Sequence, residues 1–479
     1  MPRVSSATVP AVIPERWQPI IDEAQPLADR FADAGRQLYL VGGIVRDLLV
    51  DNAVAPDADL DFTTDARPDD IEAVLRGWAD AVWTQGEKFG TIGLKKGGRP
   101  YEITTHRAEV YTPESRKPDV VFSDIVEADL SRRDFTVNAM AVCLTTAEPK
   151  LIDPFGGAVD LATKKLRTPL SPQESFSDDP LRMLRAARFI AGYGLEPDPA
   201  LTEAVAELRD RLEIVSRERI RDELDKLIVV EDPSAGLWFL VDTELVEQFL
   251  PELTQMRLEQ DPIHRHKDVL AHTIAVVANV RARTDDGAPN RTTRLAALFH
   301  DVGKPKTRAF GDGGVSFHHH EVVGARMTRE RLRALKYSND DVAQITELVY
   351  LHLRFHTYQM GWSDSAVRRF VRDAGPLLDE LIELTRCDCT TRNKRKAEQL
   401  SRRMDELETR IAELQEQEEL QAMRPDLDGR QVMALLDVEP GPVIGKAMDF
   451  LLEVRIEEGP LGEDEATRRL LAWWATRDP

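Results

Sequence analysis

Two aspartates that stand two residues apart, Asp59 and Asp61, give the sequence its first chemical signal. Successive side chains alternate across a β-strand, so in the segment DADLDFTT (57–64) both carboxylates occupy one face while Leu60 and Phe62 point into a core. Carboxylates this close repel each other unless divalent cations lie between them, and hard oxygen ligands on a rigid strand select Mg²⁺. Two such ions about 3.5–4 Å apart activate an attacking hydroxyl and stabilise a leaving pyrophosphate. The pattern predicts a two-metal transfer site, although an isolated DxD is more often a solvated strand edge.

Two weaker acidic candidates extend this site. Asp57 lies two residues before Asp59, and Glu102 belongs to the predicted strand YEITT (101–105). Glu102 is a candidate third carboxylate near the same metal ions.

A glycine pair follows the apolar strand predicted at 38–41. Gly42 and Gly43 let the backbone approach a ligand closely, and the segment IVRDLL (44–49) then begins a helix. Backbone N–H groups at such a helix start suit a phosphate. Most Gly-Gly pairs are ordinary turns, so this signal depends on the acidic strand that comes next.

Arg133 and Asp134 lie in the segment RRDFTVNAMA (132–141), just ahead of an apolar, helix-compatible stretch. Arg133 can reach a triphosphate, while Asp134 can orient it or a sugar hydroxyl. Each residue alone also fits a surface ion pair.

Three arginines recur every three residues in the segment DDPLRMLRAARF (178–189), so they follow one side of a predicted helix. They are Arg182, Arg185 and Arg188. Asp178 and Asp179 stand at the N-terminus of this helix, where acidic residues commonly serve as caps. A solvated row of arginines on an ordinary helix is the alternative.

Five segments together resemble the motifs of the class II tRNA nucleotidyltransferase and bacterial poly(A) polymerase family, which belongs to the polymerase β superfamily. They are, in the family's order, LYLVGGIVRD (38–47), DLDFTT (59–64), RRDFTVNAMA (132–141), IDPFGG (152–157) and DDPLRMLRAARF (178–189). The resemblance implies an α/β nucleotidyltransferase head, a small mixed β-sheet with helices, followed by an all-α neck, body, HD domain and tail. It also implies template-independent addition of CMP and AMP, from CTP and ATP, to the 3′ end of tRNA.

The resemblance further implies a role for each motif residue. Asp59 and Asp61 would be the catalytic ligands of Mg²⁺. Asp179 and Arg182 would face the Watson–Crick edge of CTP or ATP, and the amino group that both bases carry suits an Asp acceptor. The residues implied in holding the nucleotide are Gly42, Gly43, Arg46, Arg133, Asp134, Asp179, Arg182, Arg185 and Arg188. The family often has Glu-Asp where this chain has Asp178-Asp179, which leaves the role of Asp178 open.

A second constellation is rich in histidine, and most of the ten histidines lie between His264 and His356. His300 and Asp301 are adjacent at the end of an apolar run. Neighbouring helical residues point about 100° apart, which lets both reach one metal ion. Imidazole ligands favour Zn²⁺, Ni²⁺, Mn²⁺ or Fe²⁺ over Mg²⁺.

The spacing of these residues resembles the HD phosphohydrolase superfamily, whose pattern is one His, a His-Asp pair and a distant Asp. The four places are filled by His272, His300, Asp301 and Asp388, and the candidates for a second metal are His320 and His352. His318 and His319 fit a plain surface. A degenerate structural domain is the alternative, and the resemblance does not decide whether this domain hydrolyses a phosphoester.

Composition narrows the class of protein. The 479 residues include 63 Lys plus Arg and 84 Asp plus Glu, a net charge of −21, which argues against a protein that coats nucleic acid through bulk positive charge. We therefore expect local basic patches to meet tRNA, and no DNA partner. Three cysteines form too few disulfides to stabilise so long a chain. No uncharged apolar run reaches the ~18 residues of a membrane span, and the N-terminus lacks a signal-peptide pattern. We expect a cytoplasmic protein with no membrane partner.

The predicted elements divide the chain into an α/β part and a helical part. Short β-rich runs dominate residues 38–153, and helical periodicity takes over from residue 179. Apolar residues from Leu400 to Leu414 step by 4, 3, 4 and 3, which predicts a helical arm folded on its own domain. The predicted division is a head at 1–165, a neck and body for base and RNA binding at 166–258, an HD domain at 259–392 and a tRNA-binding tail at 393–479.

Other functions fit some of these signals. The same motifs suit poly(A) addition, or an enzyme that adds only CC or only A. An HD phosphohydrolase with a non-catalytic RNA-binding head is a second class, and a non-catalytic RNA-binding protein is a third. Intact Asp59, Asp61 and Arg133 argue against an inert head, and the net charge of −21 argues against a passive RNA coat. The sequence leaves open the nucleotides added, the HD substrate and metal, and the oligomeric state.

Overall fold

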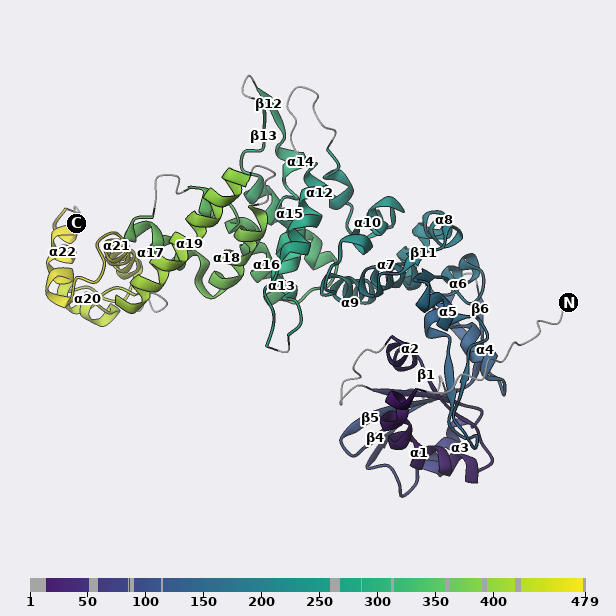
Figure 1. The fold of residues 1–479 in the computed structure, drawn as a ribbon. Coiled ribbons are helices and arrows are strands. Elements are labelled where there is room, and N and C mark those ends of the chain that lie inside the picture. The colour runs from purple at the N-terminus through teal and green to yellow at the C-terminus, as the bar shows by residue number, and fades with distance from the viewer. Residues whose placement is uncertain are drawn as a thin grey trace. The chain divides into compact units, whose positions relative to one another are not determined.

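The computed structural model describes residues 14–50, 59–84, 86, 90–112, 115–258, 268–285, 287–311, 314–357, 362–389, 394–417 and 424–476. The chain forms two compact units, Met1–Pro251 and Glu252–Pro479, drawn in Figure 1. Each unit contains hydrophobic clusters of its own.

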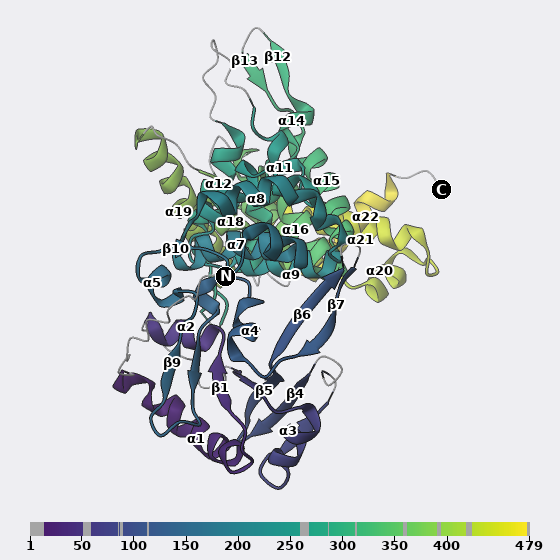
Figure 2. The ribbon, with the colours of Figure 1, turned by 90° about the vertical axis from the view of Figure 1, so that its right-hand side faces the viewer.

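A seven-stranded mixed sheet forms the head of the first unit (Figures 1 and 2). The strand order is β3-β4-β5-β2-β1-β8-β9, and β2 runs parallel to β5. The strands are β1 (Leu38–Val41), β2 (Leu60–Thr64), β3 (Ala81–Trp83), β4 (Thr91–Lys96), β5 (Arg99–Thr105), β8 (Ala141–Cys143) and β9 (Lys150–Ile152). A separate antiparallel hairpin consists of β6 (Arg107–Thr112) and β7 (Ser115–Phe122). The small mixed sheet expected from the sequence is confirmed.

Apolar side chains cover both faces of this sheet. Leu40 belongs to a large cluster that joins the strands to three helices, whereas its neighbour Val41 belongs to a second cluster. Neighbouring strand residues point to opposite faces, so both faces are packed. The helices of the first cluster are α1 (Gln18–Asp33), α2 (Gly43–Leu49) and α3 (Pro68–Leu75), and the second cluster includes α4 (Val126–Ser131).

The rest of the first unit is helical, apart from a short pair of two-residue strands, β10 (Lys165–Leu166) and β11 (Glu196–Pro197). Its helices are α5 (Gly157–Ala162), α6 (Pro172–Asp178), α7 (Leu181–Tyr193), α8 (Pro199–Leu208), α9 (Arg217–Ile228) and α10 (Ser234–Asp242). A capping box of Ser171 and Glu174 begins α6, and Gly194, at φ 63°, ends α7. Because α7 packs against α9 and α10, the arginine-rich motif lies on a helix held on two sides.

The second unit is helical as well. Its longer helices are α12 (Val269–Asn279), α13 (Arg291–Phe299), α15 (His320–Ala334), α16 (Asn339–Leu351), α17 (Asp364–Ala374), α18 (Leu378–Asp388), α19 (Lys394–Gln417), α20 (Gly429–Leu436), α21 (Pro442–Glu458) and α22 (Glu463–Ala475). Two single-turn helices are α11 (Glu252–Gln255) and α14 (Lys304–Thr307). The predicted arm is confirmed, because α19 packs on α17 and α18. None of the described helices is both long and apolar enough to cross a membrane.

Two segments differ from the sequence expectations. The helix-compatible stretch after Asp134 forms no α-helix but one 3₁₀ turn, Thr136–Asn138, and then strand β8. The cause is tertiary, because Ala141–Cys143 pairs with both β1 and β9 and is buried. In the second unit, a hairpin of β12 (Ala309–Gly311) and β13 (Gly314–Ser316) interrupts the helices.

Candidate active site and metal centre

Three carboxylates gather where β2 begins. Asp61 pairs in register with Glu102 of the parallel strand β5, and Asp59 is exposed just before β2. Burial raises the pKa of Asp61, Arg133 opposes this effect, and the charges of Glu102 and Asp59 add to it, so the pKa of Asp61 is raised to about 6. Crowded oxygen ligands of this kind are relieved by a divalent cation, and the donor set fits Mg²⁺. Asp57 lies outside the described residues.

The glycine turn lies against this acidic strand. A Cβ on Gly42, whose φ is +81°, would lie 3.4 Å from Asp61 Oδ2 and 3.5 Å from Arg133 Nη1. A Cβ on Gly43 would lie 3.2 Å from Arg46 Nη2. The structure thus brings the glycine turn close to Asp61, Arg133 and Arg46, which belong to separate motifs in the sequence.

A buried carboxylate that the sequence analysis missed, Asp129, orients Arg133. Asp129 Oδ2 accepts from Arg133 Nη2 at 3.3 Å, and Oδ1 accepts from Arg132 Nη2 at 2.8 Å. Burial raises the pKa of Asp129, but the two guanidinium groups outweigh burial and hold it at about 2. The available signal was the spacing, because Asp129 precedes the two arginines by three and four residues at the end of a helix.

Asp134 is buried, and its oxygens accept hydrogen bonds from the protein itself. Oδ1 accepts from the Phe135 N–H and from Asn138 Nδ2, both at 2.9 Å, and Oδ2 pairs with Arg185 at 2.6 Å. Asn138 Oδ1 in turn accepts from Arg46 Nη1 at 2.6 Å. Asn138, which the sequence analysis also missed, therefore connects Arg46 to Asp134 and Arg185. Direct contact of Asp134 with a nucleotide stays a prediction.

One buried aromatic ring supports three of the predicted nucleotide-binding arginines. The guanidinium carbons of Arg188, Arg46 and Arg185 lie 4.8, 5.2 and 6.0 Å from the centre of the Phe189 ring. The face of an aromatic ring attracts cations at these distances. Arg188 also pairs with the buried carboxylate of Glu223. The row on α7 is therefore held against the protein and is not the solvated face that was the alternative.

Tyr193 extends this aromatic support by one helical turn. Its ring stacks on Phe189 at 5.4 Å, and the Arg46 guanidinium lies 4.2 Å from its centre. The Tyr193 hydroxyl donates to Asp47 Oδ1 at 3.1 Å. These contacts connect α2, which follows the glycine turn, to the end of α7.

The two predicted base-binding residues have partners in the protein. Asp179 Oδ2 pairs with Arg219 at 3.0 Å. Arg182 is buried; it donates to Ser175 Oγ at 2.9 Å and to the carbonyl of Arg132. Arg182 therefore joins α7 to the segment that carries Arg133.

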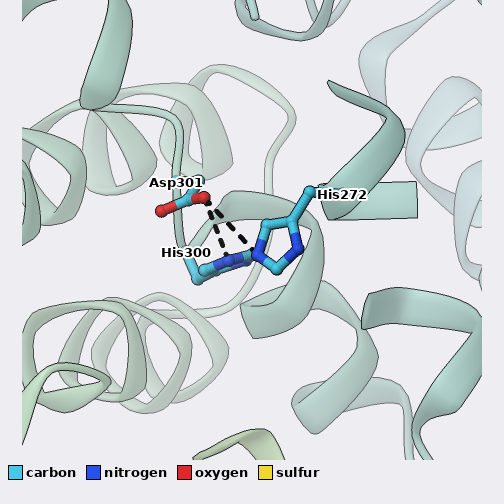
Figure 3. A group of neighbouring side chains, drawn as sticks. All are labelled: His272, His300 and Asp301. Carbon is cyan, nitrogen blue, oxygen red and sulfur yellow. Dashed lines mark ion pairs between the residues drawn. The ribbon is translucent and has the colours of Figure 1, made fainter. Parts of the chain in front are cut away.

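A separate cluster in the second unit unites the four predicted HD residues. His272 Nε2 lies 2.8 Å from Asp388 Oδ1, and His300 Nε2 lies 3.4 Å from the same oxygen and 3.3 Å from Asp301 Oδ2. His272, His300 and Asp301 face one another in Figure 3, and their ligand atoms all lie within 4.8 Å of one another. The buried His300 Nε2 has no hydrogen-bond partner. An unsatisfied imidazole nitrogen beside two carboxylates fits a transition metal.

A second group shares Asp301 with the first. Asp301 Oδ1 lies 3.4 Å from His320 Nε2, and the Nε2 atoms of His320 and His352 are 3.2 Å apart. The ligand atoms of this group also lie within 4.8 Å of one another. His320 and His352, the candidates for a second metal, thus lie near Asp301, whose two carboxylate oxygens could bind one ion in each group.

Main-chain carbonyls orient three of these imidazoles. The Nδ1 atoms of His300, His352 and His320 lie 2.7, 2.6 and 2.8 Å from the carbonyl oxygens of Ala297, Val349 and Phe317. A ring that donates from Nδ1 directs the lone pair of Nε2 to a metal.

The charges in this cluster require a positive group at its centre. Burial opposes a charge on His300, but the carboxylates of Asp301 and Asp388 outweigh burial and raise the pKa of His300 to about 10. Burial and the charge on His300 lower the pKa of His352 to about 3. Lys304, which the sequence analysis did not single out, pairs with Asp301 at 2.6 Å.

Comparison with known proteins agrees with this geometry. The Poly A polymerase head domain family matches residues 38–167, a probable RNA- and SrmB-binding site of polymerase A matches 194–256, and the HD domain family matches 269–419. The A-adding tRNA nucleotidyltransferase of Deinococcus radiodurans is 34% identical over 452 residues, which cover 92% of this chain and 96% of that protein. This chain belongs to the tRNA nucleotidyltransferase family. It is a nucleotidyltransferase with an HD domain.

Further members of the tRNA nucleotidyltransferase family match less of the chain or are less similar. The CCA-adding enzyme of Bacillus subtilis is 38% identical over 227 residues, 47% of this chain and 55% of that protein. The CCA-adding enzyme of Bacillus stearothermophilus in complex with CTP has the same fold, with a TM-score of 0.70, 24% identity and coverage of 96% and 98%. The Thermotoga maritima enzyme complexed with tRNA_CCA has a TM-score of 0.61 at 18% identity, covering 95% of this chain and 96% of that one.

Proposed function

We propose that this nucleotidyltransferase adds CMP and AMP, from CTP and ATP, to the 3′ end of tRNA. The observation that carries the proposal is the meeting of Gly42, Asp61 and Arg133 beside Glu102. Relatives named CCA-adding and A-adding enzymes support the choice of tRNA, CTP and ATP.

The head residues divide the work as follows in this proposal. Asp59 and Asp61 hold Mg²⁺, with Glu102 as a third carboxylate. Mg²⁺ held by these carboxylates would supply activation of the attacking 3′-hydroxyl and charge neutralisation of the leaving pyrophosphate. Arg133 binds the triphosphate, and the glycine turn leaves room for it. The other residues assigned to the nucleotide are Gly42, Gly43, Arg46, Asp134, Arg185 and Arg188.

Base selection falls to Asp179 and Arg182 in this proposal. An Asp oxygen accepts from the exocyclic amine of cytosine or adenine, and a guanidinium donates to a ring acceptor. The protein contacts of these two side chains imply an exchange, in which a base replaces Ser175 on Arg182 and competes with Arg219 for Asp179. Asp179→Ala and Arg182→Ala are therefore expected to change the ratio of CTP, ATP, GTP and UTP use. A uniform loss with unchanged ratios would contradict the assignment.

The HD cluster is proposed as a transition-metal phosphoesterase centre. His272, His300, Asp301 and Asp388 hold one ion of Zn²⁺, Ni²⁺, Mn²⁺ or Fe²⁺, and His320 and His352 join Asp301 around a second. The support is the buried Nε2 of His300, which lies within 3.4 Å of carboxylate oxygens of both Asp301 and Asp388. The proposed domains are the head at 1–165, the neck and body at 166–258, the HD domain at 259–392 and the tail at 393–479. The tail is proposed to bind tRNA, and the protein is proposed to be cytoplasmic.

Terminal addition is tested with tRNA transcripts that end before CCA, after C and after CC, each with CTP, ATP or both. CCA addition predicts extension of all three transcripts to the same mature length. A-only addition is the second candidate, because a relative that covers 92% of this chain is named A-adding, and it predicts extension of the CC-ended transcript alone. Extension beyond the mature length with ATP alone would instead indicate poly(A) synthesis. No extension of any transcript would refute the proposal.

A further inference from the structure

A short hairpin lies between two of the ligand-bearing segments of the HD centre, the one with Asp301 and the one with His320. Strands β12 and β13 pair antiparallel, with Phe310 opposite Val315, and α14 precedes them. The whole insertion lies between Asp301 and His320. Both views show the hairpin extending away from the neighbouring helices (Figures 1 and 2).

Both ends of this insertion are anchored in the metal centre. At one end, Lys304 Nζ lies 2.6 Å from Asp301 Oδ2 and 5.7 Å from the centre of the Phe317 ring. At the other end, the Phe317 carbonyl accepts from His320 Nδ1 at 2.8 Å. A Cβ on Gly303 would lie 2.2 Å from the His320 carbonyl oxygen, so the two ends are packed in close contact. The two ends of the insertion therefore lie beside the metal ligands.

The insertion is basic although the chain is acidic. Residues 304–317 contain Lys304, Lys306 and Arg308 but one acidic residue, Asp312, in a chain whose net charge is −21. Lys306 is exposed and Arg308 is half-buried. Local positive charge on an acidic protein selects a polyanion that reaches this surface.

The hairpin also presents an aromatic ring to solvent. Phe310 is 68% exposed, the highest value among the large apolar side chains of the described residues. The Arg308 guanidinium lies 4.8 Å from the centre of this ring. An exposed ring beside cations is the combination by which proteins hold single-stranded nucleic acid, since bases stack on the ring and phosphates meet the cations.

We propose that the β12–β13 hairpin binds the end of a single-stranded RNA and holds its terminal phosphoester beside the HD metal centre. A base stacks on Phe310, and Arg308 and Lys306 contact the backbone phosphates. The proposal rests on the phosphoesterase function proposed for this centre, but the binding it describes is measurable without catalysis.

The test compares Phe310→Ser and Arg308→Ala with wild-type full-length protein. Tyr350→Ser is the matched control, because Tyr350 is a 45% exposed aromatic residue on α16 of the same unit. The probe is a fluorescein-labelled trinucleotide whose 3′-terminal residue is 4-thiouridine, read by anisotropy over a range of salt. Cross-linking by light and peptide mapping then identify where the terminal residue binds.

Phe310→Ser is expected to weaken trinucleotide binding roughly tenfold, because one stacked base is lost. Arg308→Ala is expected to weaken binding and to reduce the salt slope by about 1. Tyr350→Ser leaves affinity unchanged, metal content stays equal in all four proteins, and the cross-link maps to residues 304–317. Equal affinities throughout, or a cross-link only elsewhere, would overturn the hairpin proposal. Failure of wild-type protein to hydrolyse any phosphoester, with Phe310-dependent binding retained, would overturn the catalytic assignment alone.

Discussion

Asp61 shows how a single residue in the head depends on its surroundings. Its carboxylate is buried and faces two other carboxylates, which raises its pKa, while Arg133 and the glycine turn lie against it. A protein interior accepts such a group when a bound cation compensates it. Binding of the proposed Mg²⁺ would therefore offset the cost of burying this carboxylate beside two others.

Asp59→Asn and Asp61→Asn are each expected to reduce incorporation of both CTP and ATP by at least about 100-fold. The reason is that metal ions stabilise the transition state by several kcal/mol, and each loss of about 1.4 kcal/mol slows the reaction tenfold. Binding of tRNA, measured by filter retention, should stay nearly unchanged. Residual activity within tenfold of wild type would rule out the metal assignment.

Phe189→Leu tests whether the shared aromatic ring positions the arginines. It removes the ring beneath Arg46, Arg185 and Arg188 while keeping most of the apolar volume, and a cation–π contact is worth about 0.5–2 kcal/mol. We expect KM for CTP and ATP to rise about five- to tenfold with a smaller change in kcat.

Phe135→Leu is the control for this substitution. Phe135 is also buried and its ring centre lies 5.2 Å from that of Phe189, so loss of packing is similar. Phe135→Leu should lower the melting temperature without the rise in KM. If both variants raise KM equally, Phe189 contributes packing and nothing more.

At the scale of an element, α4 contributes to stability through a buried ion pair. The pKa of Asp129, held at about 2, lies below its ordinary value of 3.8, so its carboxylate stabilises the fold above about pH 4 and loses this effect as pH falls toward 2. The shift corresponds to roughly 2 kcal/mol at neutral pH.

Asp129→Asn should therefore lower the free energy of unfolding by roughly 2 kcal/mol at pH 7 and by progressively less below pH 4. Chemical denaturation at a series of pH values measures this difference. A difference between Asp129→Asn and wild type that is constant from pH 7 to pH 3 would contradict the sign of this linkage.

The sequence predicts an element well where a periodic pattern of side chains within that element is enough to define it. Strand β2 alternates, α7 carries arginines at a spacing of three, and α19 follows its apolar steps, and each lies as expected. Strand β8 was missed because its three residues become a strand only by pairing with β1 and β9. The candidate site residues were predicted from motifs and stay predictions, whereas the contacts of Asp129, Asn138 and Phe189 were missed. Their roles come from contacts between distant segments, which no local pattern encodes.

At the scale of the whole molecule, the two proposed metal centres belong to different units and offer different ligands. The first unit offers carboxylates alone, and the second offers imidazoles together with carboxylates. Carboxylates alone favour Mg²⁺, whereas imidazoles favour transition-metal ions, so the two centres should bind their metal ions independently.

The double variant His300→Ala with Asp301→Ala should lose bound transition metal and any hydrolysis of 2′,3′-cyclic phosphates, yet retain nucleotide addition to tRNA. Elemental analysis and both activity assays measure this separation. His319→Ala is the control, because this histidine is 83% exposed and outside both ligand groups. Wild-type protein that carries no metal even after reconstitution would make the cluster a structural one.

The burial of Asp134 has a consequence for how far the chain can be divided. Its charge is balanced by Arg185, which lies in α7, beyond the end of the matched head domain at residue 167. A fragment that ends there would keep every strand of the large sheet but leave a carboxylate without its cation, a loss of about 3–5 kcal/mol when a buried pair is broken. The catalytic sheet is thus not a self-sufficient module, and any rearrangement by recombination would have to transfer the sheet and α7 together.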